Sequence, residues 1–215
     1  WYSAEQIPDL ANGAAVDPWP DWHLEVASTD DDADQVTASY RPQWKANRQN
    51  GRPGVKFDGS NDELKNTNGP NVSAITIACV AQVTAATSNQ IVAAEWTGDH
   101  RKFAFGINSL ERPYFGVSSD GTNDNVVYST DGTVRSTVVL LVATHPGEAG
   151  DQVLRTNMVQ VATTSVTDMF TSGTSDFRIG SVVGVNEFAD DICEIIIIDR
   201  VLNSKEIDAL EGYLN

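Results

Sequence analysis

Carboxylates are the side chains in this sequence that could most readily do chemistry. The 215-residue chain carries 30 Asp and Glu residues, against 14 Lys and Arg residues and three His residues. Hydrolysis of a glycosidic bond needs two carboxyl groups that flank the bond, and an E-x-D-x-E pattern would place three of them on one side of a strand. Neither this pattern nor the longer E-x-D-x-x-E form occurs. The sequence therefore does not predict a hydrolase.

Neither a lone buried carboxylate nor a histidine-based triad is supported as a catalytic group. Glu194 is the carboxylate inside a strongly apolar segment, and we interpret it as a structural residue near a sheet edge or a calcium neighbour. None of His23, His100 and His145 lies beside a G-x-S-x-G nucleophile turn. These residues indicate a protein that binds and does not catalyse.

A calcium site is the more plausible chemistry, because Ca²⁺ takes six to eight oxygen ligands from carboxylates and carbonyls. Residues 29–34 contain four aspartates, but Gln35 stands where an EF-hand loop needs Gly and Arg41 where it needs Glu. We interpret this run as a solvated acidic loop.

Polar and aromatic residues in the middle of the chain could bind a hydroxyl-rich ligand. Hydrogen bonds would come from a polar loop and stacking from two aromatic rings. The candidate ligand-binding residues are Trp96, Tyr114, Asp120, Asn123, Asp124 and Asn125. The alternative is that these are turn formers and core aromatics.

The elements that would position these residues are short strands separated by Gly, Asn and Asp turns. We expect strands at residues 55–57, 75–83, 90–96, 102–107, 114–118, 126–129, 138–144, 153–157, 158–163, 177–180 and 192–198, with hairpin-type turns at 120–121 and 131–132. A single helix is expected at 203–215, where Asn203 can cap it and Glu206 completes a capping box. This pattern predicts an all-β, two-sheet antiparallel jelly-roll sandwich with an irregular lead-in at residues 1–52 and a short C-terminal helix.

Composition excludes several classes of partner. The formal net charge is −16, whereas nucleic-acid binding needs a basic surface. No apolar run is long enough to cross a membrane. No C-x-x-C pattern occurs, so a zinc or redox motif is not predicted. Cys79 and Cys193 lie in apolar segments, which favours two buried free thiols. The alternative is a disulfide between them, which would need oxidising surroundings and neighbouring strands.

Several segments, taken in order, resemble laminin-G-like jelly-roll domains of the concanavalin A-like lectin/glucanase superfamily. The matching segments are residues 50–64 (NGRPGVKFDGSNDEL), 75–80 (ITIACV), 138–144, 155–159, 177–180 (FRIG), 188–202 (FADDICEIIIIDRVL) and 206–214. The resemblance spans most of the chain and implies one domain over residues 1–215. It is specific for fold and weak for function, because this fold hosts many activities.

The resemblance also implies functional expectations. Related sandwiches hold a structural calcium ion, and by position its ligands here would be Asp17, Asp21 and Asp191. Such domains are common in tailed-phage virion proteins and bacterial surface proteins. They imply a non-catalytic module on a virion or cell surface that binds glycan or protein and belongs to a larger polypeptide, as the start at Trp1 also indicates. The alternatives are a structural assembly module, as in capsid decoration, and a polysaccharide hydrolase or lyase.

Overall fold

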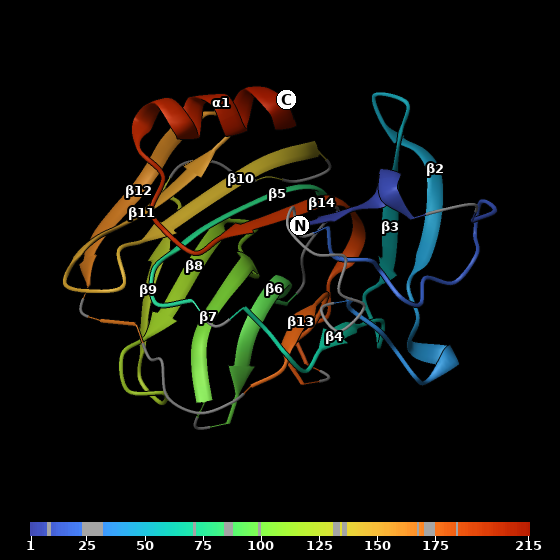
Figure 1. Ribbon diagram of the computed structural model, residues 1–215, viewed down its shortest axis with the longest axis horizontal. Helices are drawn as coiled ribbons and strands as arrows, with labels where there is room; N and C mark the ends of the chain where they lie inside the picture. Colours follow the sequence, from blue (N-terminus) through green and yellow to red (C-terminus); the bar gives the residue numbers. More distant parts are fainter. Residues whose placement is uncertain are drawn as a thin grey trace.

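Two antiparallel sheets packed face to face make up the molecule, which confirms the predicted sandwich (Figure 1). The computed structural model describes residues 1–7, 10–22, 32–70, 72–83, 88–98, 100–130, 134, 137–166, 168–169, 175–183 and 185–215. His23, residues 29–31 of the acidic run at 29–34 and the expected turn at 131–132 lie outside these residues.

The larger sheet has eight strands in the order β12-β11-β10-β5-β14-β3-β2, with β1 paired to β14. Its strands are β1 (Tyr2–Ser3), β2 (Gln43–Gln49), β3 (Arg52–Asp58), β5 (Ile75–Val83), β10 (Thr137–His145), β11 (Gly150–Thr156), β12 (Val159–Val166) and β14 (Ala189–Ile198). The central strands β5 and β14 are apolar on both faces because the second sheet covers one face and a helix covers part of the other.

The smaller sheet has six strands in the order β4-β13-β6-β7-β8-β9. Its strands are β4 (Leu64–Asn66), β6 (Gln90–Thr97), β7 (His100–Ile107), β8 (Pro113–Ser118), β9 (Asp124–Tyr128) and β13 (Phe177–Ile179). Three consecutive hairpins join β6, β7, β8 and β9, so their loops gather at the two ends of this sheet.

The core between the sheets is rich in phenylalanine. Phe103 and Phe105 from β7 both contact Phe115 from β8, with ring centroids 6.5 and 6.0 Å apart. Phe177 from β13 lies 6.4 Å from Phe103. Each of these rings is fully buried, and burying an aromatic side chain stabilises the fold by about 2–3 kcal/mol.

The helix α1 (Ser204–Leu214) covers part of the outer face of the larger sheet (Figure 1). The Asn203 side chain accepts hydrogen bonds from the backbone of Lys205 and Glu206, and Glu206 bonds back to the Asn203 amide, so the predicted capping box is confirmed. Leu214 packs with Val80 and Leu140 of the sheet. None of the helices in the described part of the chain has the length and apolar character needed to span a membrane.

The last part of the N-terminal segment is more regular than the sequence predicts. Residues 1–52 were expected to be irregular, yet β2 forms an edge strand that pairs with β3. Its sequence, QWKANRQ, shows no apolar alternation because this strand is half exposed, so it carries no strand signal. The two cysteines are free and buried as predicted: Cys79 faces the core between the sheets and Cys193 faces α1.

Candidate functional site

The outer face of the six-stranded sheet carries a second apolar cluster, separate from the core. Alternation along each strand sends every second side chain outward. Ala94, Ala104 and Tyr114 are buried members of this cluster, and Trp96 and Val126 pack against it half-buried. We call this surface the outer sheet face.

Small residues form the middle of the outer sheet face. Strand register places Ala104 beside Gly116 and Gly116 beside Val126. A Cβ atom on Gly116 would lie only 3.2 Å from a Val126 methyl group, so the valine lies over the glycine. This row is therefore flat and closely packed.

A tyrosine pair occupies one end of the outer sheet face. Tyr114 pairs with Tyr128 across β8 and β9, with ring centroids 5.9 Å apart. Tyr114 is buried, whereas Tyr128 is 48% exposed. Burial also raises the pKa of Tyr114 well above its usual range. Tyr128 is thus the ring that this end offers for stacking.

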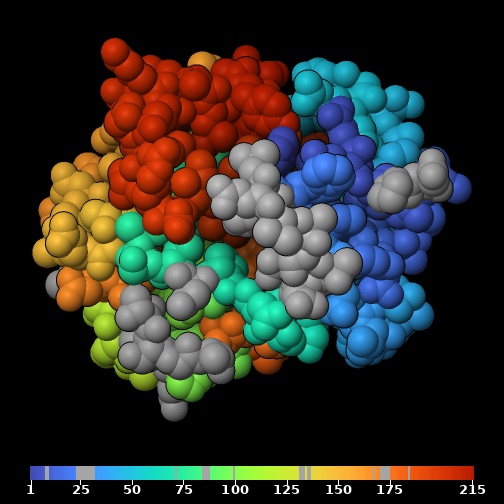
Figure 2. All heavy atoms as spheres, in the orientation of Figure 1, coloured from blue at the N-terminus to red at the C-terminus, as the bar shows by residue number. Residues whose placement is uncertain are grey.

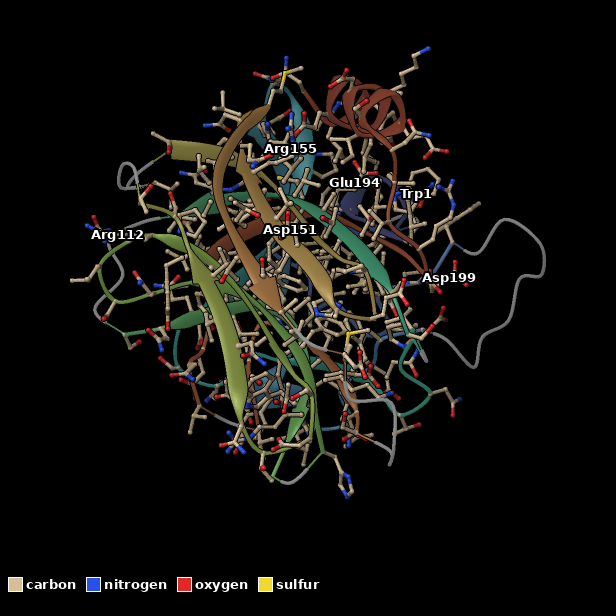
Figure 3. All side chains as sticks on the ribbon, turned by 90° about the vertical axis from the view of Figure 1, so that its left-hand side faces the viewer. Trp1, Arg112, Asp151, Arg155, Glu194 and Asp199 are labelled. Atoms are coloured by element: carbon tan, nitrogen blue, oxygen red, sulfur yellow. The ribbon has the colours of Figure 1, made fainter. Side chains whose placement is uncertain are left out.

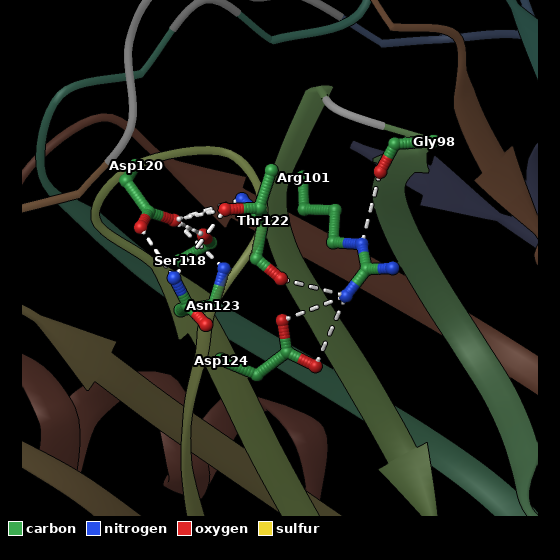
Figure 4. Close-up of polar contacts among 7 residues, drawn as sticks. All are labelled: Gly98, Arg101, Ser118, Asp120, Thr122, Asn123 and Asp124. Carbon is green, nitrogen blue, oxygen red and sulfur yellow. Dashed lines mark hydrogen bonds and ion pairs between the residues drawn. The ribbon is translucent and has the colours of Figure 1, made fainter.

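An arginine held against a tryptophan occupies the other end. The Arg101 guanidinium carbon lies 5.4 Å from the centre of the Trp96 ring, within cation–π range. Arg101 Nε donates to the Gly98 carbonyl at 3.0 Å, and one terminal nitrogen donates to the Thr122 carbonyl at 2.9 Å and to the Asp124 carboxylate at 3.2 Å (Figure 4). The second terminal nitrogen, Nη2, has no hydrogen-bond partner among the residues that the structure describes.

The loop between β8 and β9 is held by Asp120. Its carboxylate accepts hydrogen bonds from the Asn123 and Thr122 amides at 2.7 and 2.8 Å and from the Asn123 side chain at 2.6 Å (Figure 4). These bonds, led by the Asn123 amide, lower the pKa of Asp120 well below its usual range. Asp120 therefore shapes the loop that places Asp124 beside Arg101.

A buried ion pair supports this end from the core side. Lys102 Nζ donates to Glu95 Oε1 at 3.0 Å, and both residues are at most 3% exposed. The register pairs Glu95 with Phe103 and Trp96 with Arg101, so Lys102 is the extra residue of a β-bulge. Burial raises the pKa of Glu95 to about 7. The inner pair thus fixes the hairpin that carries Trp96 and Arg101 outward.

The two ends of the outer sheet face are separated along the strands. Tyr128 and Asp124 lie four residues apart on β9, which is about 13 Å at the usual strand rise. A ligand that touched both ends would have to be extended, with several rings or groups in a row.

The structure brings most of the predicted ligand residues together, with changed roles. Trp96 and Tyr114 share one face, but a guanidinium covers the Trp96 ring and Tyr114 is buried, so neither offers an open stacking surface. Asp120 and Asn123 bond chiefly within their own loop. Asn125 is half-buried at the start of β9.

Sequence reasoning missed Arg101 and Tyr128. Tyr128 could have been found, because strict alternation along β9 places it on the same side as Val126. Arg101 could not, because the bulge at Lys102 breaks the alternation that would assign its side.

The predicted calcium ligands do not form a cluster. Asp17 pairs with Arg41, Asp21 with the Trp1 amino group, and Asp191 with Arg48. The described residues contain no group of three or more His, Cys, Asp or Glu side chains arranged to hold a metal ion. As the sequence placed them, these three carboxylates do not fit a calcium site, since each already faces a cation of the chain. Calcium binding stays a prediction.

Comparison with known proteins gives similarity in structure alone. No protein-family model matches the chain, and no curated protein sequence matches it. The carbohydrate-binding module CBM40 of the Ruminococcus gnavus IT-sialidase, bound to α2,3-sialyllactose, is similar with a TM-score of 0.61 and 14% identity, over 74% of this chain and 95% of that one. This chain shares the two-sheet fold of that module.

Two toxin domains show the same similarity over more of the chain. The binding domain of Paraclostridial Mosquitocidal Protein 1 has a TM-score of 0.65 and 10% identity, over 87% of this chain and 51% of that one. The binding domain of botulinum neurotoxin serotype D/C has a TM-score of 0.61 and 13% identity, over 87% and 50%. The chain thus spans about half of each toxin domain. The concanavalin A-like assignment is not tested by these similarities and stays a prediction.

Proposed function

We propose that this chain is a non-catalytic glycan-binding domain that holds an oligosaccharide along the outer sheet face. The observation that carries the proposal is the Arg101 guanidinium, which is clamped against Trp96 by three oxygen acceptors and keeps Nη2 unengaged. A planar donor fixed before binding loses little conformational entropy when it donates to a sugar oxygen.

The other end of the outer sheet face supplies an aromatic surface for stacking. Tyr128 presents an exposed ring, on which the C–H face of a sugar ring can pack. The flat Ala104–Gly116–Val126 row lies between this ring and Arg101. Two of the structurally similar proteins are toxin binding domains, and one is a carbohydrate-binding module bound to sialyllactose, which supports a binding role.

A glycan array tests the proposal. We expect Arg101→Met and Tyr128→Ala each to reduce binding at least about tenfold, the effect of losing one charge-assisted hydrogen bond or one stacking contact. Arg200→Met is the matched control, because Arg200 is an exposed arginine that pairs with Glu206 beside α1. Binding that survives both substitutions on the outer sheet face would refute this location.

The setting we propose is a virion or bacterial cell surface, which rests on the sequence resemblance given above. The competing role is a structural assembly module whose loops contact protein. An array that stays silent, with wild-type protein shown to be folded, would favour that role. Repeating the array with calcium and with a chelator tests whether glycan binding needs calcium, and loss of binding on chelation would support that prediction.

A further inference from the structure

A pocket of about 270 Å³ lies on the opposite side of the molecule, between the end of α1 and the hairpin that joins β2 to β3. These two segments meet along the upper edge of the molecule (Figure 2). Val80 and Leu214 are apolar residues of the lining, and Gln49, Asn50 and Arg52 line it from the hairpin. The volume is at the lower limit of small-molecule sites.

A β-bulge aims a carboxylate into this pocket. Along β14 the register advances from Ile192 to Glu194 while β5 advances by one residue, so Cys193 is the extra residue. The bulge lets Cys193 and Glu194 both face the α1 side, where strict alternation would send one of them into the core. Such re-aimed side chains are frequent at functional sites.

One carboxylate oxygen of Glu194 accepts hydrogen bonds within the protein, and the other is available to a ligand. Its Oε1 accepts hydrogen bonds from Trp1 Nε1 at 2.6 Å and from the Tyr213 hydroxyl at 2.9 Å. Figure 3 shows Trp1 and Glu194 close together next to α1. The Trp1 and Tyr213 rings meet edge to face, 6.0 Å apart. Glu194 Oε2 has no hydrogen-bond partner within the described part of the chain.

The rest of the lining supplies both donors and acceptors. Arg52 is 53% exposed and lies 3.6 Å from Glu5, so its charge is only loosely paired. Gln49 Oε1 is buried and receives no hydrogen bond from the residues that the structure describes, and a buried acceptor without a donor is uncommon. Among the residues that line the pocket, Arg52 and Glu194 carry one charge of each sign, so the lining itself favours neither a cation nor an anion.

We propose that this pocket binds one neutral sugar ring through its hydroxyl groups. A hydroxyl both donates and accepts, which suits a lining of carboxylate, amides and guanidinium. Neighbouring hydroxyls would donate to Glu194 Oε2 and accept from Arg52 and Asn50, while Val80 and Leu214 contact the C–H face. This site does not depend on the outer sheet face, which lies on the other sheet.

Indole N–H resonances test the proposal directly. Trp1 Nε1 donates to Glu194, so the Trp1 signal in a ¹H–¹⁵N spectrum reports on this pocket, whereas the Trp96 signal reports on the outer sheet face. Trp1→Phe and Trp96→Phe variants assign the two signals. The probes are glucose, galactose, mannose and N-acetylglucosamine as free sugars, each up to about 20 mM, because a ligand of this size binds with a Kd on the order of 1 mM.

We expect at least one free sugar to shift the Trp1 signal with saturation, and Glu194→Gln to weaken that response at least tenfold. Glutamine can still accept from Trp1 and Tyr213, but it replaces the Oε2 acceptor by a donor. Asn50→Gly is the second variant. It removes a lining amide at a backbone position with φ of 47°, which glycine accepts, so it weakens binding without strain.

Two results would overturn the proposal: a Trp1 signal that no sugar moves, or sugar responses unchanged in both Glu194→Gln and Asn50→Gly. The Tyr128→Ala variant separates the two sites, since it should leave the Trp1 response intact. Loss of glycan binding at the outer sheet face would therefore leave this inference standing, and the reverse also holds.

Discussion

Lys102→Met should destabilise the protein in a way that depends on pH. The substitution keeps the aliphatic stem and removes the ammonium group that faces Glu95 inside the sandwich. Even in the wild-type protein, Glu95 Oε2 accepts no hydrogen bond from any described residue. Without Lys102, the ionised carboxylate would be buried with no partner.

The magnitude follows from linkage between protonation and folding. The pKa of Glu95 is about 7 in the folded protein, raised chiefly by burial, and Lys102 opposes that rise; in the unfolded chain the pKa is about 4.3. Because folding raises this pKa, the contribution of Glu95 to stability is fully present below about pH 4 and is lost as pH rises toward 7. Above pH 7 the Glu95 carboxylate is ionised and paired with Lys102, so its contribution to stability falls no further.

In Lys102→Met the pKa of Glu95 lies higher still, so the loss continues above pH 7 at about 1.4 kcal/mol per pH unit. At pH 5 both proteins hold Glu95 protonated and the substitution has little electrostatic cost. At pH 9 the variant should therefore have lost up to about 3 kcal/mol more free energy of unfolding than at pH 5, relative to wild type, because the two proteins diverge over at most about two pH units.

Urea unfolding followed by tryptophan fluorescence at pH 5, 7 and 9 measures this difference. The double variant Glu95→Gln/Lys102→Met is the control, because it has neither charge and its difference from wild type should not grow above pH 7. A cost of Lys102→Met that is the same at pH 5 and pH 9 would refute the assignment of a buried, coupled pair.

Three further predictions rest on other contacts. Gly180→Ala should lower the free energy of unfolding by roughly 3 kcal/mol, because φ is +87° and the new Cβ would lie 2.3 Å from the Phe57 ring; thermal unfolding measures it. Arg155→Met should cost about 3 kcal/mol and speed hydrogen exchange in α1, because it leaves the Glu211 carboxylate buried without its two 2.8 Å bonds. Asp120→Ala should speed amide exchange in the β8–β9 loop, since it removes the acceptor that orders the turn.

The glycine and arginine substitutions each have a matched control. Gly212→Ala in α1 places a Cβ with no described residue outside its own helix turn within 4 Å, so it should be neutral or slightly stabilising. Arg200→Met removes a solvent-exposed ion pair and should leave the free energy of unfolding nearly unchanged. If Gly180→Ala were as mild as Gly212→Ala, or Arg155→Met as mild as Arg200→Met, the close contacts described here would be incorrect.

Much of the fold could be predicted because its strands carry strong local signals. The apolar runs of β5, β10 and β14 and the Asn203 cap of α1 were found close to their observed bounds. β2 was missed because a half-exposed edge strand needs no apolar alternation, and its pairing with β3 is a tertiary effect.

The candidate sites were less predictable because bulges decide them. Trp96 was placed on a strand correctly, but the cation that covers it follows from the bulge at Lys102. Glu194 was interpreted as a structural residue, and only the bulge at Cys193 shows that it faces a pocket. A bulge is a one-residue change in pairing, and it leaves no trace in residue type or spacing.

The two candidate binding sites lie on different sheets. The pocket beside α1 is on the larger sheet, and Arg101 and Tyr128 are on the smaller one. The outer faces of the two sheets point in opposite directions. One copy of the protein therefore cannot contact the same flat layer of sugars with both sites. Occupying both would join two separate glycans, as a cross-linker does, and would add no avidity on a single surface. Stronger attachment to one surface would then require several copies with the same face turned toward it.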